Sequence, residues 1–241
     1  MASLLVLWDV DHTLINAGGV GIEVYERAFR ELYSRDVPSV RINMAGRTDR
    51  AIAIEMLTVA GLTDPHGQVA EFQAVQARHA PTLAPEFAAR GRVLPGVREV
   101  IAAIAAGPRP GLQIVQSLLT GNVRELADVK LSSLGLTEHL DLDAGAYGTE
   151  SEIRADLVPV ARANAARRYG ADFSGQATVL VGDTPLDIEA ALATGARAVG
   201  VATGPFTAED LAAAGAHTVL PDLADTPAVL SAILGPHTAR R

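Results

Sequence analysis

The ten residues from 4 to 13, Leu-Leu-Val-Leu-Trp-Asp-Val-Asp-His-Thr, decide how the rest of the chain is interpreted. Residues 4–8 form a continuous apolar run, which is typical of a strand buried on both faces of a parallel sheet. Asp9 and Asp11 follow at once, so two carboxylates stand at the carboxyl end of this strand. An isolated pattern of this kind more often marks only an Asx turn, so its meaning depends on the other segments.

Apolar runs that end in polar residues recur along the chain, and amphipathic segments lie between them. We expect strands at 112–119, 178–181, 196–202 and 218–220, and helices at 97–106, 123–134, 152–169, 186–194 and 208–214. Alternating strands and helices predict an α/β fold with a doubly wound, Rossmann-like parallel sheet. Ligands of such sheets bind at the carboxyl ends of the strands.

The segment 15–94 breaks this alternation, because helical spacing recurs at 22–35, 49–60 and 67–90 with no convincing strand between. We therefore expect an all-helical cap, residues 15–94, inserted into an α/β core made of residues 1–14 and 95–241. Turn-forming residues at 16–19 and 91–96 are expected to act as hinges of this cap.

Composition excludes several classes of protein. The chain has 241 residues, of which 49% are hydrophobic and 20% charged, as in folded globular proteins. Lys+Arg 20 against Asp+Glu 28 gives a net charge of −8 without a basic tract, so we expect no nucleic-acid or membrane partner. The absence of cysteine excludes a disulfide framework and a catalytic thiol. No signal peptide or long apolar run is present, and we expect a cytoplasmic location; the oligomeric state is left open.

A second acidic pair, Asp183 and Asp187, follows the apolar run at 178–181. Four carboxylates at strand ends repel one another unless a divalent cation lies among them, and oxygen ligands favour Mg²⁺. Asp187 also has a purely structural interpretation, since Thr184 as N-cap and Pro185 at the first helical position make it the acid of a capping box.

Two further segments could bind an anion. Thr120, Gly121 and Asn122 combine a hydroxyl, a glycine and a helix start, which together can hold a phosphate, although Asn122 and Glu125 could equally form only a capping pair. Arg154 is expected in the first turn of the helix at 152–169, where the helix dipole opposes a cation. It therefore needs an anion nearby or is merely solvated.

In order and spacing these motifs resemble the haloacid dehalogenase-like hydrolase superfamily, in its phosphatase branch with a helical cap, such as the phosphoglycolate phosphatase-like members. The matching motifs are 9–13, 120–122, a basic residue before the last motif, and 182–187; residues 94–97 resemble the return from cap to core. The resemblance implies a Mg²⁺-dependent phosphomonoester hydrolase acting on a small phosphorylated metabolite through an aspartyl-phosphate intermediate.

The resemblance also implies a role for each residue. Asp9 would attack phosphorus, and Asp11 would protonate the leaving oxygen and then activate water, crowding by anions keeping it protonated. Asp9, the backbone carbonyl of Asp11 and Asp183 would bind Mg²⁺, with Asp187 in support. The phosphoryl oxygens would be held by Thr120, Gly121, Asn122 and Arg154.

Two positions depart from the family pattern. The basic residue is more often lysine, but the only lysine here, Lys130, lies about two helical turns beyond Asn122 and so about 12 Å away. We therefore expect Arg154 to take this place. His12 stands where glycine is frequent, and we interpret it as a turn residue or a wall of the pocket.

Other functions are compatible with parts of this pattern. A sugar phosphomutase of the same superfamily usually has a histidine near the first hinge, and residues 16–30 contain none. A catalytically silent phosphate-binding module would normally lack one of the two acids, Asp9 or Asp11. In the cap, Arg47, Thr48 and Asp49 resemble a substrate-specificity loop; they could equally be a solvated arginine and a helix N-cap.

Overall fold

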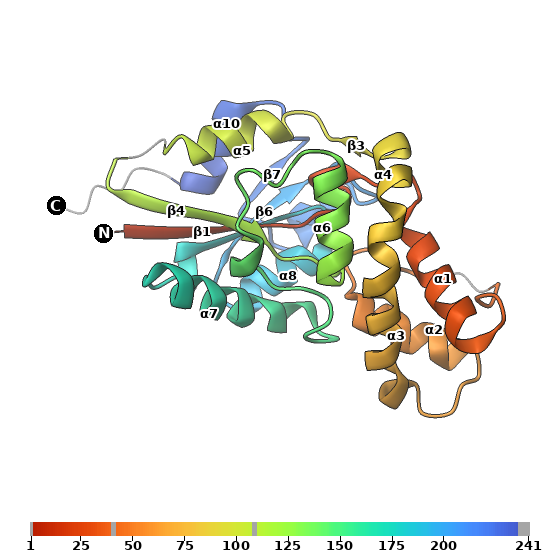
Figure 1. The fold of residues 1–241 in the computed structure, drawn as a ribbon. Coiled ribbons are helices and arrows are strands. Elements are labelled where there is room, and N and C mark those ends of the chain that lie inside the picture. The colour runs from red at the N-terminus through yellow and green to blue at the C-terminus, as the bar shows by residue number, and fades with distance from the viewer. Residues whose placement is uncertain (1, 40–41, 108–109, 236–241) are drawn as a thin grey trace.

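The computed structural model describes residues 2–39, 42–107 and 110–235 and contains a five-stranded parallel sheet. The strand order is β4-β1-β5-β6-β7, with helices on both faces (Figure 1). The strands are β1 (Ala2–Trp8), β4 (Leu112–Leu118), β5 (Thr178–Gly182), β6 (Arg197–Val201) and β7 (Thr218–Leu220). The predicted fold class is confirmed.

Strand β1 lies between β4 and β5, and its side chains alternate between two hydrophobic layers. Leu4, Val6 and Trp8 pack on the face covered by α5 (Val97–Ala105), α6 (Arg124–Ser133) and α10 (Thr226–Leu234). Leu5 and Leu7 pack on the face covered by α7 (Leu157–Tyr169) and α8 (Pro185–Ala193). Because both faces of its buried part are covered, residues 4–8 are all apolar.

Four helices at one end of the sheet enclose a hydrophobic cluster of their own (Figure 1). They are α1 (Gly21–Tyr33), α2 (Asp49–Val59), α3 (Pro65–His79) and α4 (Ala84–Arg90), and are called the cap helices below; residues 42–48, before α2, are called the cap loop. Val123, directly before α6, and Leu126 and Val129 of α6 belong to this cluster. Ala127 and Leu131 of the same helix pack instead against the sheet. One helix therefore packs against both groups of helices.

The structure departs from the predicted elements at several places. The single helix expected at 67–90 is wrong: a 3₁₀ turn (Ala80–Leu83) separates α3 from α4, because Pro81 and Pro85 cannot continue a helix as donors. Two short strands, β2 (Ile15–Asn16) and β3 (Arg92–Val93), overlap the two expected hinges and pair antiparallel. Helix α10 was not predicted, and α9 (Ala208–Ala213) was. The division at residues 15–94 stays a prediction.

Among the described residues, no helix combines the length and the apolar character that crossing a membrane requires.

The start of α2 and the residues just before it cross two other loops at very short range. Asp49 N donates to Gly121 O at 2.6 Å, and Arg50 N donates to Gly148 O at 3.1 Å. A Cβ on Gly148 would lie 1.6 Å from Gly121 O, and one on Gly121 would lie 2.0 Å from Arg47 O. Glycine at both positions is what allows the three backbone segments to approach.

We predict that Gly148→Ala lowers the free energy of unfolding by at least about 2 kcal/mol, because backbone atoms must move apart. Gly61→Ala is the control, since its Cβ would meet nothing within 4 Å and only its positive φ of 72° is unfavourable, at about 1 kcal/mol. Urea unfolding measures both. A loss for Gly148→Ala no larger than that of Gly61→Ala would contradict the tight crossing.

Candidate active site

The chain turns back immediately after β1 and so brings Asp9 and Asp11 to one side of the sheet edge. Asp9 N still bonds to Val181 O of β5 at 2.9 Å, and Leu14 N bonds to Val10 O at 3.0 Å. His12 has a positive φ of 60°, which confirms it as a turn residue. The two acids are therefore placed by a turn whose geometry the histidine allows.

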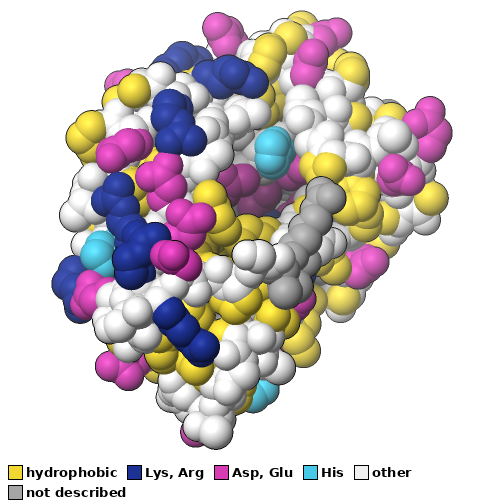
Figure 2. Space-filling view, turned by 90° about the vertical axis from the view of Figure 1, so that its right-hand side faces the viewer, with side chains coloured by type: hydrophobic (Ala, Val, Ile, Leu, Met, Phe, Trp, Pro, Cys, Tyr) yellow, Lys and Arg dark blue, Asp and Glu magenta, His cyan; other side chains and the backbone are white. Residues whose placement is uncertain are grey.

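A cavity of about 490 Å³ lies between this edge of the sheet and the cap helices. The face seen in Figure 2 is hollowed, and acidic side chains lie in its depth. All predicted site residues except Thr48 and Asp187 line the cavity, namely Asp9, Asp11, Arg47, Asp49, Thr120, Gly121, Asn122, Arg154 and Asp183. The structure thus brings together residues from both halves of the chain.

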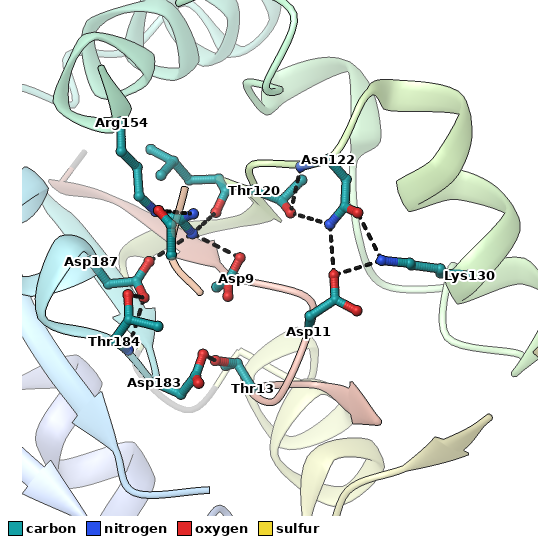
Figure 3. A network of polar contacts seen from close by, with 12 residues as sticks. Asp9, Asp11, Thr13, Thr120, Asn122, Lys130, Arg154, Asp183, Thr184 and Asp187 are labelled. Carbon is teal, nitrogen blue, oxygen red and sulfur yellow. Dashed lines mark hydrogen bonds and ion pairs between the residues drawn. The ribbon is translucent and has the colours of Figure 1, made fainter. Parts of the chain in front are cut away.

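Arg154 is buried at the centre of this arrangement (Figure 3). Its Nη2 lies 2.7 Å from both Asp9 Oδ1 and Asp187 Oδ1, and its Nη1 donates to Gly46 O of the cap loop at 3.1 Å. Burial opposes its charge, but Asp187 and Asp9 hold the pKa of Arg154 above its ordinary value. The expected place in a first α-helical turn is wrong, because Arg154 belongs to a 3₁₀ turn (Arg154–Asp156) and α7 begins at Leu157.

Asp9, Asp183 and Asp187 are buried with carboxylate oxygens within 4.8 Å of one another. Burial, with Asp9 and Asp187 nearby, raises the pKa of Asp183 to about 9. Burial also raises the pKa of Asp9 to about 6, although Arg154 opposes this. Asp183 has only a 3.3 Å hydrogen bond from Thr13 Oγ1 as a polar partner in the described side chains. Crowded oxygen donors whose burial and mutual repulsion raise these pKa values fit a Mg²⁺ ion, which would favour their ionised forms.

Asp187 has the structural role that the sequence suggested as well as a place in the acidic cluster. Its Oδ2 accepts hydrogen bonds from Thr184 N at 3.1 Å and Thr184 Oγ1 at 2.7 Å, as in a capping box at the start of α8. Its Oδ1 faces Arg154. The capping interpretation is confirmed, and both oxygens already have protein partners.

Lys130 lies in the site, so the prediction that it stands about 12 Å away is wrong. Helical side chains point back toward the N-terminus of their helix, and the lysine chain spans the remaining distance. Its Nζ donates to Asp11 Oδ2 at 2.6 Å and to Asn122 Oδ1 at 2.7 Å. Burial alone would raise the pKa of Asp11, but Lys130 and Asn122 hold it below its ordinary value. The expectation that crowding keeps Asp11 protonated is therefore wrong for this arrangement.

The segment after β4 places the polar side chains of Thr120 and Asn122 beside Asp11. Thr120 Oγ1 accepts hydrogen bonds from Asn122 Nδ2 at 2.7 Å and from Asn122 N at 3.3 Å. Asn122 is not the N-cap of α6, because Val123 takes that position, and Glu125 is exposed on the helix. The capping-pair interpretation is therefore wrong, and Asn122 faces Asp11 instead.

The cap loop places its three predicted residues differently. The guanidinium of Arg47 bonds to Glu55, to Asn43 O and to Ala51 O, all within the cap. Thr48 is the N-cap of α2 and accepts a hydrogen bond from Ala51 N at 3.2 Å. The Arg47 guanidinium is therefore held by residues of its own segment, and Thr48 is not among the residues that line the cavity.

Asp49 is buried and joins the cap to the start of α6. It accepts hydrogen bonds from the Tyr25 hydroxyl and from Val123 N, the latter at 2.7 Å. Burial raises its pKa to about 6, against the opposing effect of these two donors. Sequence reasoning missed Tyr25; its only signal was a hydroxyl-bearing ring on the apolar face of the helix predicted at 22–35.

Comparison with known proteins finds similarity to hydrolases and to a protein named as a phosphatase. A family model described as "HAD-hyrolase-like" matches residues 154–226. The chain is 26% identical over 238 residues to "Probable phosphatase IndB" of Dickeya dadantii (strain 3937), covering 95% of this chain and 94% of that protein.

Solved structures share the fold over nearly the whole chain. A hydrolase from Pseudomonas syringae superposes with a TM-score of 0.65 at 20% identity, covering 95% of this chain and 98% of the other. A haloacid dehalogenase-like family hydrolase from Streptococcus pneumoniae superposes with a TM-score of 0.62 at 16% identity, covering 94% and 98%.

We predict that Asp183→Asn raises the melting temperature of the metal-free protein at pH 7 by a few degrees. A raised pKa means that the wild type must take up a proton at Asp183 when it folds, and the neutral amide removes this cost. Mg²⁺ should raise the melting temperature of the wild type and have little effect on the variant. Differential scanning calorimetry in EDTA and in Mg²⁺ tests both statements. A variant stabilised by Mg²⁺ as much as the wild type would remove Asp183 from the metal site.

The pH dependence of stability tests Asp49. A folded-state pKa near 6, above the ordinary value of 3.8, means that the folded protein holds this proton more firmly, so its contribution to stability falls as pH rises through this window. Asp49→Asn lacks this dependence. Its stability relative to the wild type should increase between pH 4 and pH 6 by about 1–3 kcal/mol in urea unfolding. A pH-independent difference would mean that Asp49 is ionised throughout.

Proposed function

We propose, on the premise that the chain belongs to the haloacid dehalogenase-like hydrolases and to their phosphatase branch, that it hydrolyses small phosphomonoesters through an aspartyl phosphate. The observation that carries the proposal is the placement of Asp9 and Asp11 at one cavity, with Arg154 2.7 Å from Asp9 Oδ1. A carboxylate held by a guanidinium is oriented and remains available as a nucleophile.

In the first half of the reaction, an oxygen of Asp9 forms a bond to phosphorus while the bond from phosphorus to the leaving oxygen breaks. Arg154 keeps Asp9 in place, because the guanidinium is itself held by Asp187, Leu119 O and Gly46 O. Asp11 gives a proton to the leaving oxygen. An incoming phosphoryl dianion favours the protonated form of Asp11, because like charges repel.

In the second half, water attacks phosphorus and the bond to Asp9 breaks. Asp11 takes a proton from this water, which restores the proton given earlier and releases inorganic phosphate. Lys130 and Asn122 hold the pKa of Asp11 below its ordinary value, which supports the ionised form that acts as this base. One carboxyl group thus serves as acid and then as base.

The phosphoryl oxygens meet donors from the segment after β4. The Thr120 oxygen already accepts two hydrogen bonds, so its own hydrogen is available to an anion. The Gly121 N–H has no acceptor in the described part of the chain and lies at the cavity. Asp9, Asp183 and the backbone carbonyl of Asp11, with Asp187 in support, would hold Mg²⁺. The bound ion would offset the charge of the phosphate and polarise it.

The alternatives from the sequence give different products. A sugar phosphomutase would return the phosphoryl group to another hydroxyl of the same sugar and release little inorganic phosphate. A silent binding module would bind phosphate esters without turnover, and the presence of both acids at the cavity supports an active site instead.

Selection among esters is assigned to the cap. The distal part of the cavity is lined by apolar side chains, among them Ile22, Met44, Ile52 and Leu126. Since the Arg47 guanidinium is bonded within the cap, we propose that the specificity loop, Arg47 to Asp49, shapes this part of the cavity and that its apolar walls favour leaving groups with an apolar face.

We expect phosphate release from several small phosphomonoesters with Mg²⁺, loss of release in EDTA, and no measurable turnover by Asp9→Asn, because an amide cannot form the acyl phosphate. Asp36→Asn, at an exposed aspartate that pairs with Arg30, is the matched control and should be fully active. Released phosphate is measured colorimetrically and the sugar products by NMR. Full turnover in EDTA would overturn the metal assignment, and turnover by Asp9→Asn would overturn the covalent intermediate.

A further inference from the structure

Lys130 is the single lysine among twenty lysine and arginine residues of the chain, and it is 3% exposed. It lies on α6, and its ammonium reaches Asp11 Oδ2 and Asn122 Oδ1 (Figure 3). Gly21 at the start of α1 lies over it, since a Cβ there would be 3.6 Å from Nζ. The site therefore contains a second buried cation besides Arg154.

A lysine only donates hydrogen bonds, and this determines which way the Asn122 amide is turned. Asn122 must present Oδ1 to the ammonium, so its NH₂ group faces the other way. That group donates to Asp11 Oδ2 at 2.9 Å and to Thr120 Oγ1 at 2.7 Å. The hydroxyl of Thr120 consequently accepts from Asn122 and has its own hydrogen left to donate into the cavity.

The same two donors anchor one oxygen of Asp11. Oδ2 accepts hydrogen bonds from both Lys130 and Asn122. Oδ1 accepts none from the described part of the chain, and the side chain is 33% exposed, at the cavity. The anchored oxygen fixes the carboxyl group, and the other oxygen is left to face a leaving group or water.

We propose that Lys130 is a positioning residue that fixes Asp11 for proton transfer and, through Asn122, sets the direction of the Thr120 hydroxyl. The expected loss of turnover rests on the proposed phosphatase function, whereas the positioning of Asp11 and Asn122 does not. Lys130 touches neither phosphorus nor the leaving oxygen; it acts through Asp11 and Asn122.

A compact ammonium suits this place better than a guanidinium, because two acceptors lie 2.6 and 2.7 Å from one nitrogen atom. A buried ion pair is poor evidence for a role in stability, since desolvation offsets its attraction. The experiment must therefore separate a positioning role from a structural one.

The first test compares Lys130→Met, which keeps the length of the side chain without donor or charge, with the wild type on two substrates. An alkyl phosphate needs a proton on its leaving oxygen, whereas p-nitrophenyl phosphate hardly does. We expect kcat/KM to fall at least about a hundredfold for the alkyl ester and clearly less for the aryl ester. Equal losses on both esters, or no loss, would overturn the proposal.

Arg162→Met is the matched control. Arg162 is a half-buried cation of α7 that bonds to Thr178 Oγ1, Thr194 O and Gly175 O, away from the cavity. Its loss should change both esters by the same factor. Lys130→Arg, which retains a donor-only cation, should recover more alkyl ester turnover than Lys130→Met, and failure to do so would count against the donor argument.

Crystal structures of the wild type and Lys130→Met give a readout that needs no activity. We expect Asp11 or the Asn122 amide to leave its place when Lys130 is replaced. If both keep their positions and contacts, the proposal fails whatever the kinetics. If the wild type hydrolyses no phosphate ester, the proposed function fails, and the two structures still decide the role of Lys130.

Discussion

The guanidinium of Arg154 offsets the repulsion among carboxylates that two neighbouring strands bring to one edge of the sheet. Asp9 follows β1 and Asp187 follows β5, and both face the same Nη2 at 2.7 Å. The other terminal nitrogen bonds to Gly46 O in the cap loop. Electrostatic balance in the core and the position of the cap loop therefore depend on one side chain, which is itself held by a short 3₁₀ turn.

Features that depend on a short local stretch of sequence could be predicted. Apolar runs predicted the strands because a strand covered on both faces is mostly apolar. Acids and hydroxyls directly after these runs predicted the polar residues that the sheet edge contributes to the cavity, since parallel strands bring their carboxyl ends to one edge. The capping box of Thr184 and Asp187 was equally local and therefore visible.

Features that depend on side-chain reach or on distant partners could not be predicted in this way. The rise of the helix alone sets Lys130 far from Asn122, but the lysine side chain extends back and its Nζ reaches Asn122 Oδ1. Val123 N donates a hydrogen bond to Asp49 only when α2 and α6 are packed together, and no local sequence pattern indicates this hydrogen bond. The break before α4 depended on Pro81, whose effect on a helix the amphipathic spacing does not reveal.

Helix α6 has consequences for how such an enzyme can be recombined. Its Leu126 and Val129 complete the interior of the inserted helices, while Ala127 and Leu131 belong to the interior of the sheet. A chimera that exchanged only the inserted segment for that of a relative would set a foreign surface against these side chains. Successful grafts, in the laboratory or in evolution, must therefore carry one face of α6 along with the transplanted segment.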